Sequence, residues 1–75
     1  MTTLRQIERG EFFFCPEIGG DYFYQMIKKS HMYSDAIRYI NVNGHLKFSG
    51  IANFNLHDSG DKEAIIIDVK MEADL

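Results

Sequence analysis

The residue types that could hold a metal ion are present, but their spacing does not predict a site. The histidines stand at His31, His45 and His57, so consecutive histidines are 14 and 12 positions apart, and the single cysteine is Cys15. Zinc sites usually contain at least one pair of ligands about two to four positions apart. Three separate surface histidines explain the same residues, and we expect no bound metal and no other cofactor.

The candidates for nucleophilic or phosphate chemistry are equally isolated. No sequence neighbour of Cys15 is placed to lower the pKa of its thiol clearly, and buried cysteines usually serve as inert packing. The acidic turn 58–63 lacks the alternating ligands of a calcium loop, and Gly19-Gly20 is not followed by the lysine and hydroxyl residue of a phosphate-binding loop. We therefore expect that this chain is not an enzyme.

The length of 75 residues limits the chain to one domain, spanning residues 1–75. A chain of this size hides roughly 60% of its surface on folding, which suffices for a thin core. No apolar stretch approaches the ~18 residues of a membrane span. The single cysteine excludes an internal disulfide, which favours a reducing compartment. We expect a cytoplasmic protein with no membrane partner.

The charge of −3 is unevenly distributed along the chain. The central segment 22–57 is basic, because Lys28, Lys29, Arg38 and Lys47 face Asp35 alone. The flanking segments 1–21 and 58–75 are net acidic. Basic residues mixed with aromatic residues suit a single-stranded nucleic acid, so the block 22–48 supports an alternative function in nucleic-acid binding. The acidic C-terminal segment supports a weaker alternative, in which carboxylates imitate phosphates.

The N-terminal segment predicts a short helical turn over residues 3–9. Thr3 and Gln6 have the spacing of a capping box. Leu4 and Ile7 are three positions apart and can both face inward. Gly10 suits the left-handed residue that commonly follows a helix end.

The remainder of the chain predicts short antiparallel strands. Asn43-Gly44 is the strongest turn signal, because both residues accept the positive φ of a type I′ hairpin. Ser49-Gly50 indicates a bend or bulge at which one long strand becomes two. The strands are expected over 11–15, 22–28, 36–42, 45–56 and 64–69, with turns over 16–21 and 57–62, a polar loop over 29–35 and a frayed end over 71–75.

These elements predict a mainly β fold: a five- to six-stranded antiparallel sheet that is strongly curled or forms a partly open barrel. Curling hides the strand edges, which otherwise invite aggregation. The N-terminal turn is expected to close one end. A flatter sheet packed on a longer helix is the alternative architecture.

Two consecutive strands carry bulky rings on both faces, in Phe12-Phe13-Phe14 and Tyr22-Phe23-Tyr24. A thin curled sheet has one interior, so its strands should alternate bulky and polar residues. We infer a second covered surface, which contacts a partner protein or a second copy of the chain. Alternatively, the outward rings lie under segments 29–35 and 57–62, and which face of 22–28 is inside stays open. The predicted contact residues are Phe13, Tyr22, Tyr24, Tyr33 and Tyr39, flanked by Lys28, Lys29 and Arg38.

Residues 4–48 resemble a group of small β-barrel accessory proteins encoded by phages. The resemblance rests on Leu4-x-x-Ile7-x-x-Gly10-Glu11-Phe12-x-Phe14, a Gly-Gly turn, Tyr-Phe-Tyr with a lysine at the strand end, and Ala36 leading into Asn43-Gly44. It implies a protein of phage or mobile-element origin in a bacterial cytoplasm. It further implies an inhibitor that binds a host protein, such as a component of a CRISPR–Cas or restriction defence system. A self-assembling structural protein is the remaining alternative.

Overall fold

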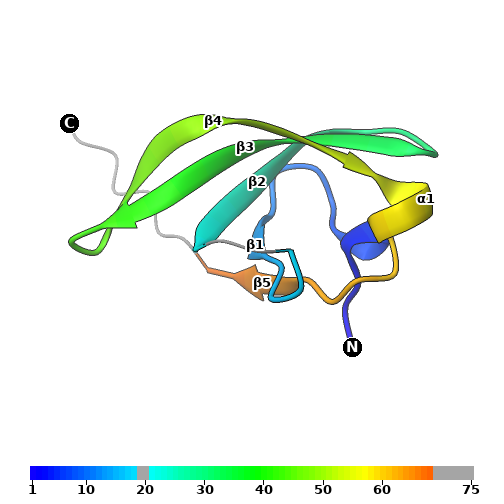
Figure 1. Cartoon of the computed structure of the whole chain (residues 1–75), viewed down its shortest axis with the longest axis horizontal. Helices are drawn as coiled ribbons and strands as arrows, with labels where there is room; N and C mark the ends of the chain where they lie inside the picture. The colour runs from blue at the N-terminus through cyan, green and yellow to red at the C-terminus, as the bar shows by residue number, and fades with distance from the viewer. Residues whose placement is uncertain (19–20, 69–75) are drawn as a thin grey trace.

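The chain folds into one antiparallel five-stranded sheet with a short helical turn at each of two positions (Figure 1). The structure is a computed structural model that describes residues 1–18 and 21–68. Within these described residues the strand order is β4-β3-β2-β1-β5, so β4 and β5 are the two edges and the sheet is not closed into a barrel. The elements are η1 (Leu4–Gln6), β1 (Phe12–Phe14), β2 (Tyr22–Lys29), β3 (Tyr33–Val42), β4 (His45–Asn55), α1 (Leu56–Ser59) and β5 (Ile65–Ile67). The predicted mainly β fold class is confirmed.

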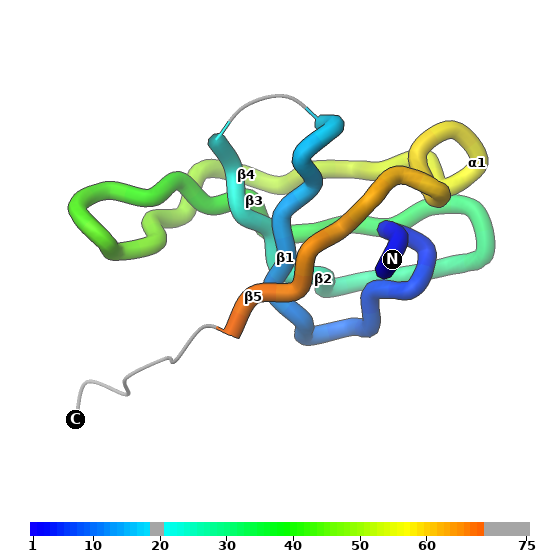
Figure 2. Tube along the Cα trace, turned by 90° about the horizontal axis from the view of Figure 1, so that it is seen from below, coloured from blue at the N-terminus to red at the C-terminus, as the bar shows by residue number. Residues whose placement is uncertain are grey.

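The sheet is folded over, so that its two parts enclose the core. In Figure 1, β2, β3 and β4 form the upper layer, and β1 and β5 lie below them. Figure 2, seen from below, shows β1 and β5 crossing under the long strands. The turns η1 and α1 lie together at one end, where the backbone N–H groups of Leu4 and Arg5 donate to the carbonyls of Lys62 and Gly60 at 2.9 Å each. The N-terminal turn therefore closes one end of the sheet, as predicted.

The N-terminal helix is shorter than the predicted range 3–9. It is a single 3-10 turn, and Ile7 already has the extended values φ −68° and ψ 130°. The Gln6 half of the capping box forms, since the Thr3 N–H donates to Gln6 Oε1 at 3.0 Å. Leu4 and Ile7 are both fully buried. The extended backbone after the turn leads the chain to Gly10, which has the predicted positive φ of +95°.

The predicted loop 29–35 is wrong in its extent. Lys28 pairs with Asp35 and Lys29 pairs with Ser34, so β2 and β3 continue until only residues 30–32 remain outside the strands. Polar residues indicated a loop here, but a strand near the end of a sheet tolerates them on its solvent side. Ser34 even faces inward and is 1% exposed.

The predicted bend or bulge at Ser49-Gly50 is a bulge, but β4 continues through it as one strand and does not divide into two. The register shifts opposite Arg38 and Tyr39, which leaves Ser49 as the extra residue, and Gly50 has a φ of +145° that favours glycine. The hairpin at Asn43-Gly44 is confirmed by φ values of +53° and +84°.

The C-terminal part differs in detail from the predicted elements. Helix α1 begins at Leu56, the last residue of the predicted strand 45–56, and extends into the predicted turn 57–62. Its N-cap is the Asn55 side chain, which accepts from the His57 N–H at 2.9 Å. Strand β5 covers Ile65–Ile67 only. Ala64 and Asp68, which the prediction included in the strand, lie outside it, whereas residue 69 and the predicted frayed segment 71–75 lie outside the described residues. No helix in residues 1–18 or 21–68 is long and apolar enough to cross a membrane.

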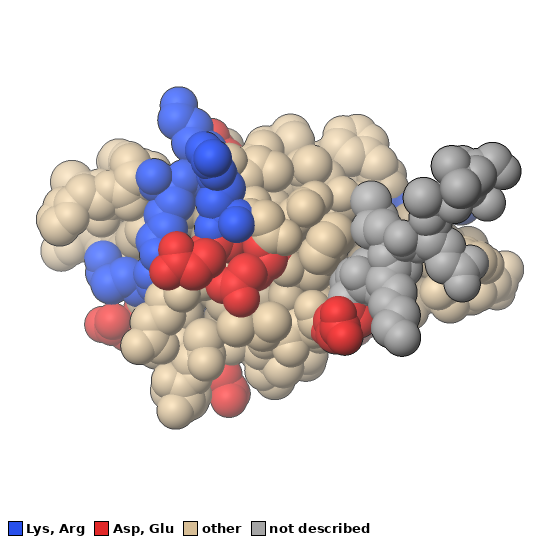
Figure 3. All heavy atoms as spheres, turned by 180° about the vertical axis from the view of Figure 1, so that it is seen from behind, with Lys and Arg blue, Asp and Glu red and all other residues tan. Residues whose placement is uncertain are grey.

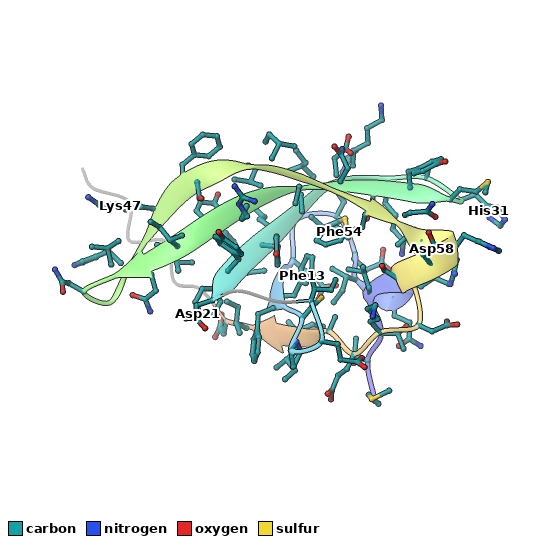
Figure 4. All side chains as sticks on the ribbon, in the orientation of Figure 1. Phe13, Asp21, His31, Lys47, Phe54 and Asp58 are labelled. Atoms are coloured by element: carbon teal, nitrogen blue, oxygen red, sulfur yellow. The ribbon has the colours of Figure 1, made fainter. Side chains whose placement is uncertain are left out.

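The core centres on three rings that pack between the two layers. The Phe13 ring stacks on Tyr24 at a centroid distance of 5.5 Å and lies 6.2 Å from Phe54. Phe54 in turn meets Tyr24 edge to face at 5.1 Å. Figure 4 shows Phe13 and Phe54 pointing toward each other from β1 and β4. Around these rings lie the other buried apolar side chains, those of Leu4, Ile7, Cys15, Met26, Ala36, Leu56 and Ala64.

Cys15 is expected to be unreactive in the native protein. Its side chain is buried, and burial raises the pKa of the thiol from 9.0 to about 11, with the Glu17 carboxylate adding to the rise. Because of this rise in pKa, the fraction of the thiol that is ionised at pH 8 is about 100-fold lower than for a free cysteine. Alkylation by iodoacetamide should therefore be slow until a denaturant unfolds the chain. Rapid labelling of the native protein would contradict this burial.

The stability of the domain is expected to fall as the pH rises from 9 toward 11. Burial raises the pKa of Cys15 and also that of the Tyr24 phenol, so the folded state keeps both groups neutral. In the unfolded chain both groups ionise at a lower pH than in the folded state. Their contribution to the free energy of unfolding is therefore complete below about pH 9 and is lost as the pH rises above that value. Denaturant midpoints measured from pH 8 to 11 test this. The variant Cys15→Ala should lose less stability over that range than the wild type, and equal losses would exclude the cysteine as a cause.

Candidate protein-interaction surface

Only three of the ten aromatic rings, those of Phe13, Tyr24 and Phe54, are buried in the core. The register of the strands explains where five of the others lie. One row of paired residues crosses all five strands on the face opposite the core, because Phe12 pairs with Gln25 on one side and with Ile67 on the other. From β5 to β4 this row is Ile67, Phe12, Gln25, Ile37 and Ile51.

A second row runs beside the first on the same face. Phe14 pairs with Ile65, and its ring lies 6.0 Å from that of Phe23 on the neighbouring strand. Phe23 pairs with Tyr39, which pairs with Phe48. We call the two rows together the outer apolar face. Its ten residues are Phe12, Phe14, Phe23, Gln25, Ile37, Tyr39, Phe48, Ile51, Ile65 and Ile67, and none is charged.

The outer apolar face is ordered by contacts among its own side chains. The rings of Phe12 and Tyr39 lie 5.9 Å apart, and the Tyr39 hydroxyl donates to Gln25 Oε1 at 3.3 Å. Exposure is greatest toward the edges, at 68% for Phe48, 54% for Ile51 and 39% for Ile65. The alternative that segments 29–35 and 57–62 cover the outward rings therefore does not hold for Phe48. A face of this kind needs little rearrangement to bind, which lowers the entropic cost of association.

Polar residues border the face at the end that carries η1 and α1. The next row contains Lys28, Asp35 and Asn53, and the Asn53 amide donates to the Asp35 carboxylate. Figure 3 shows the Lys and Arg side chains of that view gathered at the same end. An apolar centre with a polar rim is the usual composition of a protein–protein interface.

Two of the predicted contact residues are in the wrong place for that role. Phe13 is 0% exposed and Tyr24 is 4% exposed, so neither side chain can meet a partner in this fold. They alternate with the outward rings: Phe13 lies between Phe12 and Phe14, and its pair Tyr24 follows Phe23. The sequence showed that side chains alternate between the two faces of these strands. It did not show which of the two faces points toward the core.

The remaining predicted contact residues are divided among three places. Tyr39 belongs to the outer apolar face, Tyr33 is 57% exposed at the start of β3, and Lys28 lies in the rim. Lys29 Nζ donates to the Ile7 carbonyl at 3.1 Å, which ties β2 to the N-terminal segment. The other two, Tyr22 and Arg38, pack together on the inner face with the guanidinium 4.6 Å from the ring centroid.

The basic block 22–48 does not form one surface. Lys28 lies in the rim of the outer face, whereas Arg38 is half-buried on the inner face. Lys47 is on the inner side of the β3–β4 hairpin, since it pairs with Ile40, the partner of Tyr22. Figure 4 shows Lys47 at the opposite end of the molecule from His31 and Asp58.

The partner-contact residues predicted from the sequence did not include Phe12, Phe14, Phe23, Phe48 and Ile51. A usable signal was the polar Gln25, which shares its parity with Phe23 and marks that parity as the solvent side of β2. In residues 1–18 and 21–68 no three His, Cys, Asp or Glu side chains lie close enough together to hold a metal ion. Comparison with known proteins found no matching family model, no matching curated protein and no matching solved structure.

Proposed function

We propose that this chain is a non-enzymatic binding module that docks its outer apolar face onto another protein and covers part of that protein's surface. The observation that supports the proposal is the pair of uncharged rows crossing all five strands. Exposed apolar patches bordered by polar residues are typical of interaction sites. The cost of keeping Ile65, which is 39% exposed, in water is recovered when a partner covers it.

The resemblance to small phage proteins supports a bacterial host protein as the partner. In this proposal the module acts stoichiometrically, by occluding a site on a larger assembly such as a defence nuclease. The partner then presents an apolar surface that accepts Phe14, Phe23 and Ile65 at its centre. A few such rings supply most of the affinity in interfaces of this kind.

A matched pair of variants tests the proposal, because Ile65 and Ile66 are neighbours in β5 that face opposite sides. Both are partly exposed, at 39% and 48%, but only Ile65 belongs to the outer apolar face. We expect Ile65→Lys to weaken binding at least tenfold, about 1.4 kcal/mol, whereas Ile66→Lys binds like the wild type. The partner is recovered from a bacterial lysate with the tagged wild type, and its affinity for each variant is measured by calorimetry. Equal affinities of the two variants for the partner would exclude the outer apolar face as the binding site.

The inner face supports a second candidate function, binding of single-stranded nucleic acid. Arg38 stacks on Tyr22, makes no ion pair with a described carboxylate, and has a buried Nε with no hydrogen-bond partner. Under this function the pull-down returns nucleic acid, and affinity falls steeply with salt concentration. The variant Arg38→Gln would then reduce binding while Ile65→Lys would not, which separates the two functions.

A further inference from the structure

The edge of the sheet formed by β4 has no strand beside it. In the described parts of the chain, β4 pairs only with β3, and it is the longest strand, with 11 residues. Its outward backbone N–H and C=O groups are therefore available to another strand. The opposite edge, β5, has only three residues and offers little length for pairing.

Strand β4 lacks most of the features that protect an edge from pairing. It contains no proline, and Lys47 is its only formally charged residue. Natural edges are commonly protected by charges, prolines, short length or bulges. Here the protective features are the bulge at Ser49-Gly50 and the single charge of Lys47, whereas the strand is neither short nor interrupted by proline.

The bulge determines the register in which two copies of β4 can pair. Before it, Leu46 and Phe48 point to the outer face, because they pair with Asn41 and Tyr39. After it, Ile51 and Asn53 point to the outer face, because they pair with Ile37 and Asp35. The even and odd positions thus exchange faces at the bulge. An antiparallel pairing centred between residues 49 and 50 places outer side chains opposite outer side chains along the whole strand.

We propose that two copies of this chain pair antiparallel along β4, about a two-fold axis at Ser49-Gly50, and form a ten-stranded sheet. In this register Phe48 lies opposite Ile51 of the second copy, and each contributes to burying the other. These are the two most exposed apolar side chains of the outer face, at 68% and 54%. The small residues Ser49 and Gly50 meet at the axis, where the backbones approach most closely.

The charge of β4 does not oppose a second copy as the occupant of the edge. Lys47 comes opposite Ala52 of the second copy, so the single cation of each strand does not face its equivalent. Opposite residues in an antiparallel pair interact most strongly, and like charges there are destabilising. The same segment supplies both halves of the contact, as a two-fold interface requires. The pairing also joins the outer apolar faces of the two copies into one surface.

Sedimentation equilibrium over a range of concentrations tests the proposal. The average mass of the wild type should rise from 8.7 kDa toward twice that value as the concentration increases. The variant Ile51→Lys should remain at the monomer mass, because two lysines enter the centre of the interface. The variant Ile65→Lys, at the opposite edge, should assemble like the wild type even though it loses partner binding. A wild type that keeps the monomer mass at every concentration would overturn the proposal, without bearing on the partner surface around Ile65.

Disulfide trapping tests the register independently of any loss of assembly. All variants carry Cys15→Ala, so that the introduced thiol is alone. Mild oxidation of a mixture of Phe48→Cys and Ile51→Cys should give a disulfide-linked heterodimer, because these positions are directly opposite. A mixture of Phe48→Cys and Ile65→Cys should not. A dimer that persists in Ile51→Lys, or a mixture in which 48 and 51 do not cross-link, would exclude this interface.

Discussion

Replacing Phe13 with alanine is expected to lower the free energy of unfolding by about 3–5 kcal/mol, the usual cost of removing a buried phenylalanine ring. Phe13 is the largest fully buried side chain and contacts both other core rings, Tyr24 and Phe54. A domain of 75 residues has a total stability of about 4–11 kcal/mol. The variant is therefore expected to populate the unfolded state substantially at room temperature.

Urea denaturation followed by circular dichroism measures this loss, and Phe48→Ala is the matched control. The same chemical change at Phe48 removes a ring that is 68% exposed in the single chain. At a protein concentration low enough to keep the chain monomeric, its effect on stability should therefore lie within about 0.5 kcal/mol of zero. If the two variants lost similar stability, the assignment of Phe13 to the core and Phe48 to the surface would be wrong.

Replacing Gly60 with alanine is the second change for which a large loss of stability is expected. Gly60 has φ −60° and ψ −27°, which any residue adopts, so the reason is contact and not backbone conformation. A Cβ atom at this position would overlap the Leu56 carbonyl oxygen and lie 2.8 Å from Arg5 Cζ. Overpacking of this kind typically costs about 1–3 kcal/mol.

The loss of stability in Gly60→Ala should lie at the high end of that range, because several hydrogen bonds are made at or beside Gly60. The Gly60 N–H donates to the Leu56 carbonyl and the Gly60 carbonyl accepts from the Arg5 N–H, both at 2.9 Å. The Arg5 guanidinium also donates to the Leu56 carbonyl. Thermal unfolding of Gly60→Ala and of the neighbouring control Ser59→Ala measures the effect. A melting temperature for Gly60→Ala equal to that of the control would show that η1 and α1 can separate without cost.

Local signals in the sequence predicted the fold class well. Asn43-Gly44 placed the hairpin because few other residues accept two positive φ values in succession. The alternation in 45–56 predicted a strand, and Ser49-Gly50 predicted an irregularity within it. The prediction of a loop over 29–35 was wrong because strand pairing is set by partners distant in the sequence. Lys28 and Lys29 stay in β2 because Asp35 and Ser34 lie opposite them, which composition alone does not reveal.

The exposure of some aromatic rings was predicted from the sequence, but the residues that carry the exposed rings were mostly not. An excess of rings over the capacity of one interior correctly indicated that some would be exposed. Choosing between Phe12, Phe13 and Phe14 requires knowing which parity faces inward, and a one-residue error exchanges the two faces. That choice depends on η1 and α1 packing under the sheet, contacts that join residues 51 positions apart in the case of Arg5 and Leu56.

The three consecutive phenylalanines of β1 have consequences for how this protein can change over time. The middle ring holds the domain together, whereas its two neighbours contribute to a surface that the fold itself tolerates in water. Under the proposed function, mutations at Phe12 and Phe14 would alter what the molecule binds while leaving its architecture intact. Adjacent codons would then be subject to separate selective pressures, and new binding specificities would arise through substitutions at every second position of a strand.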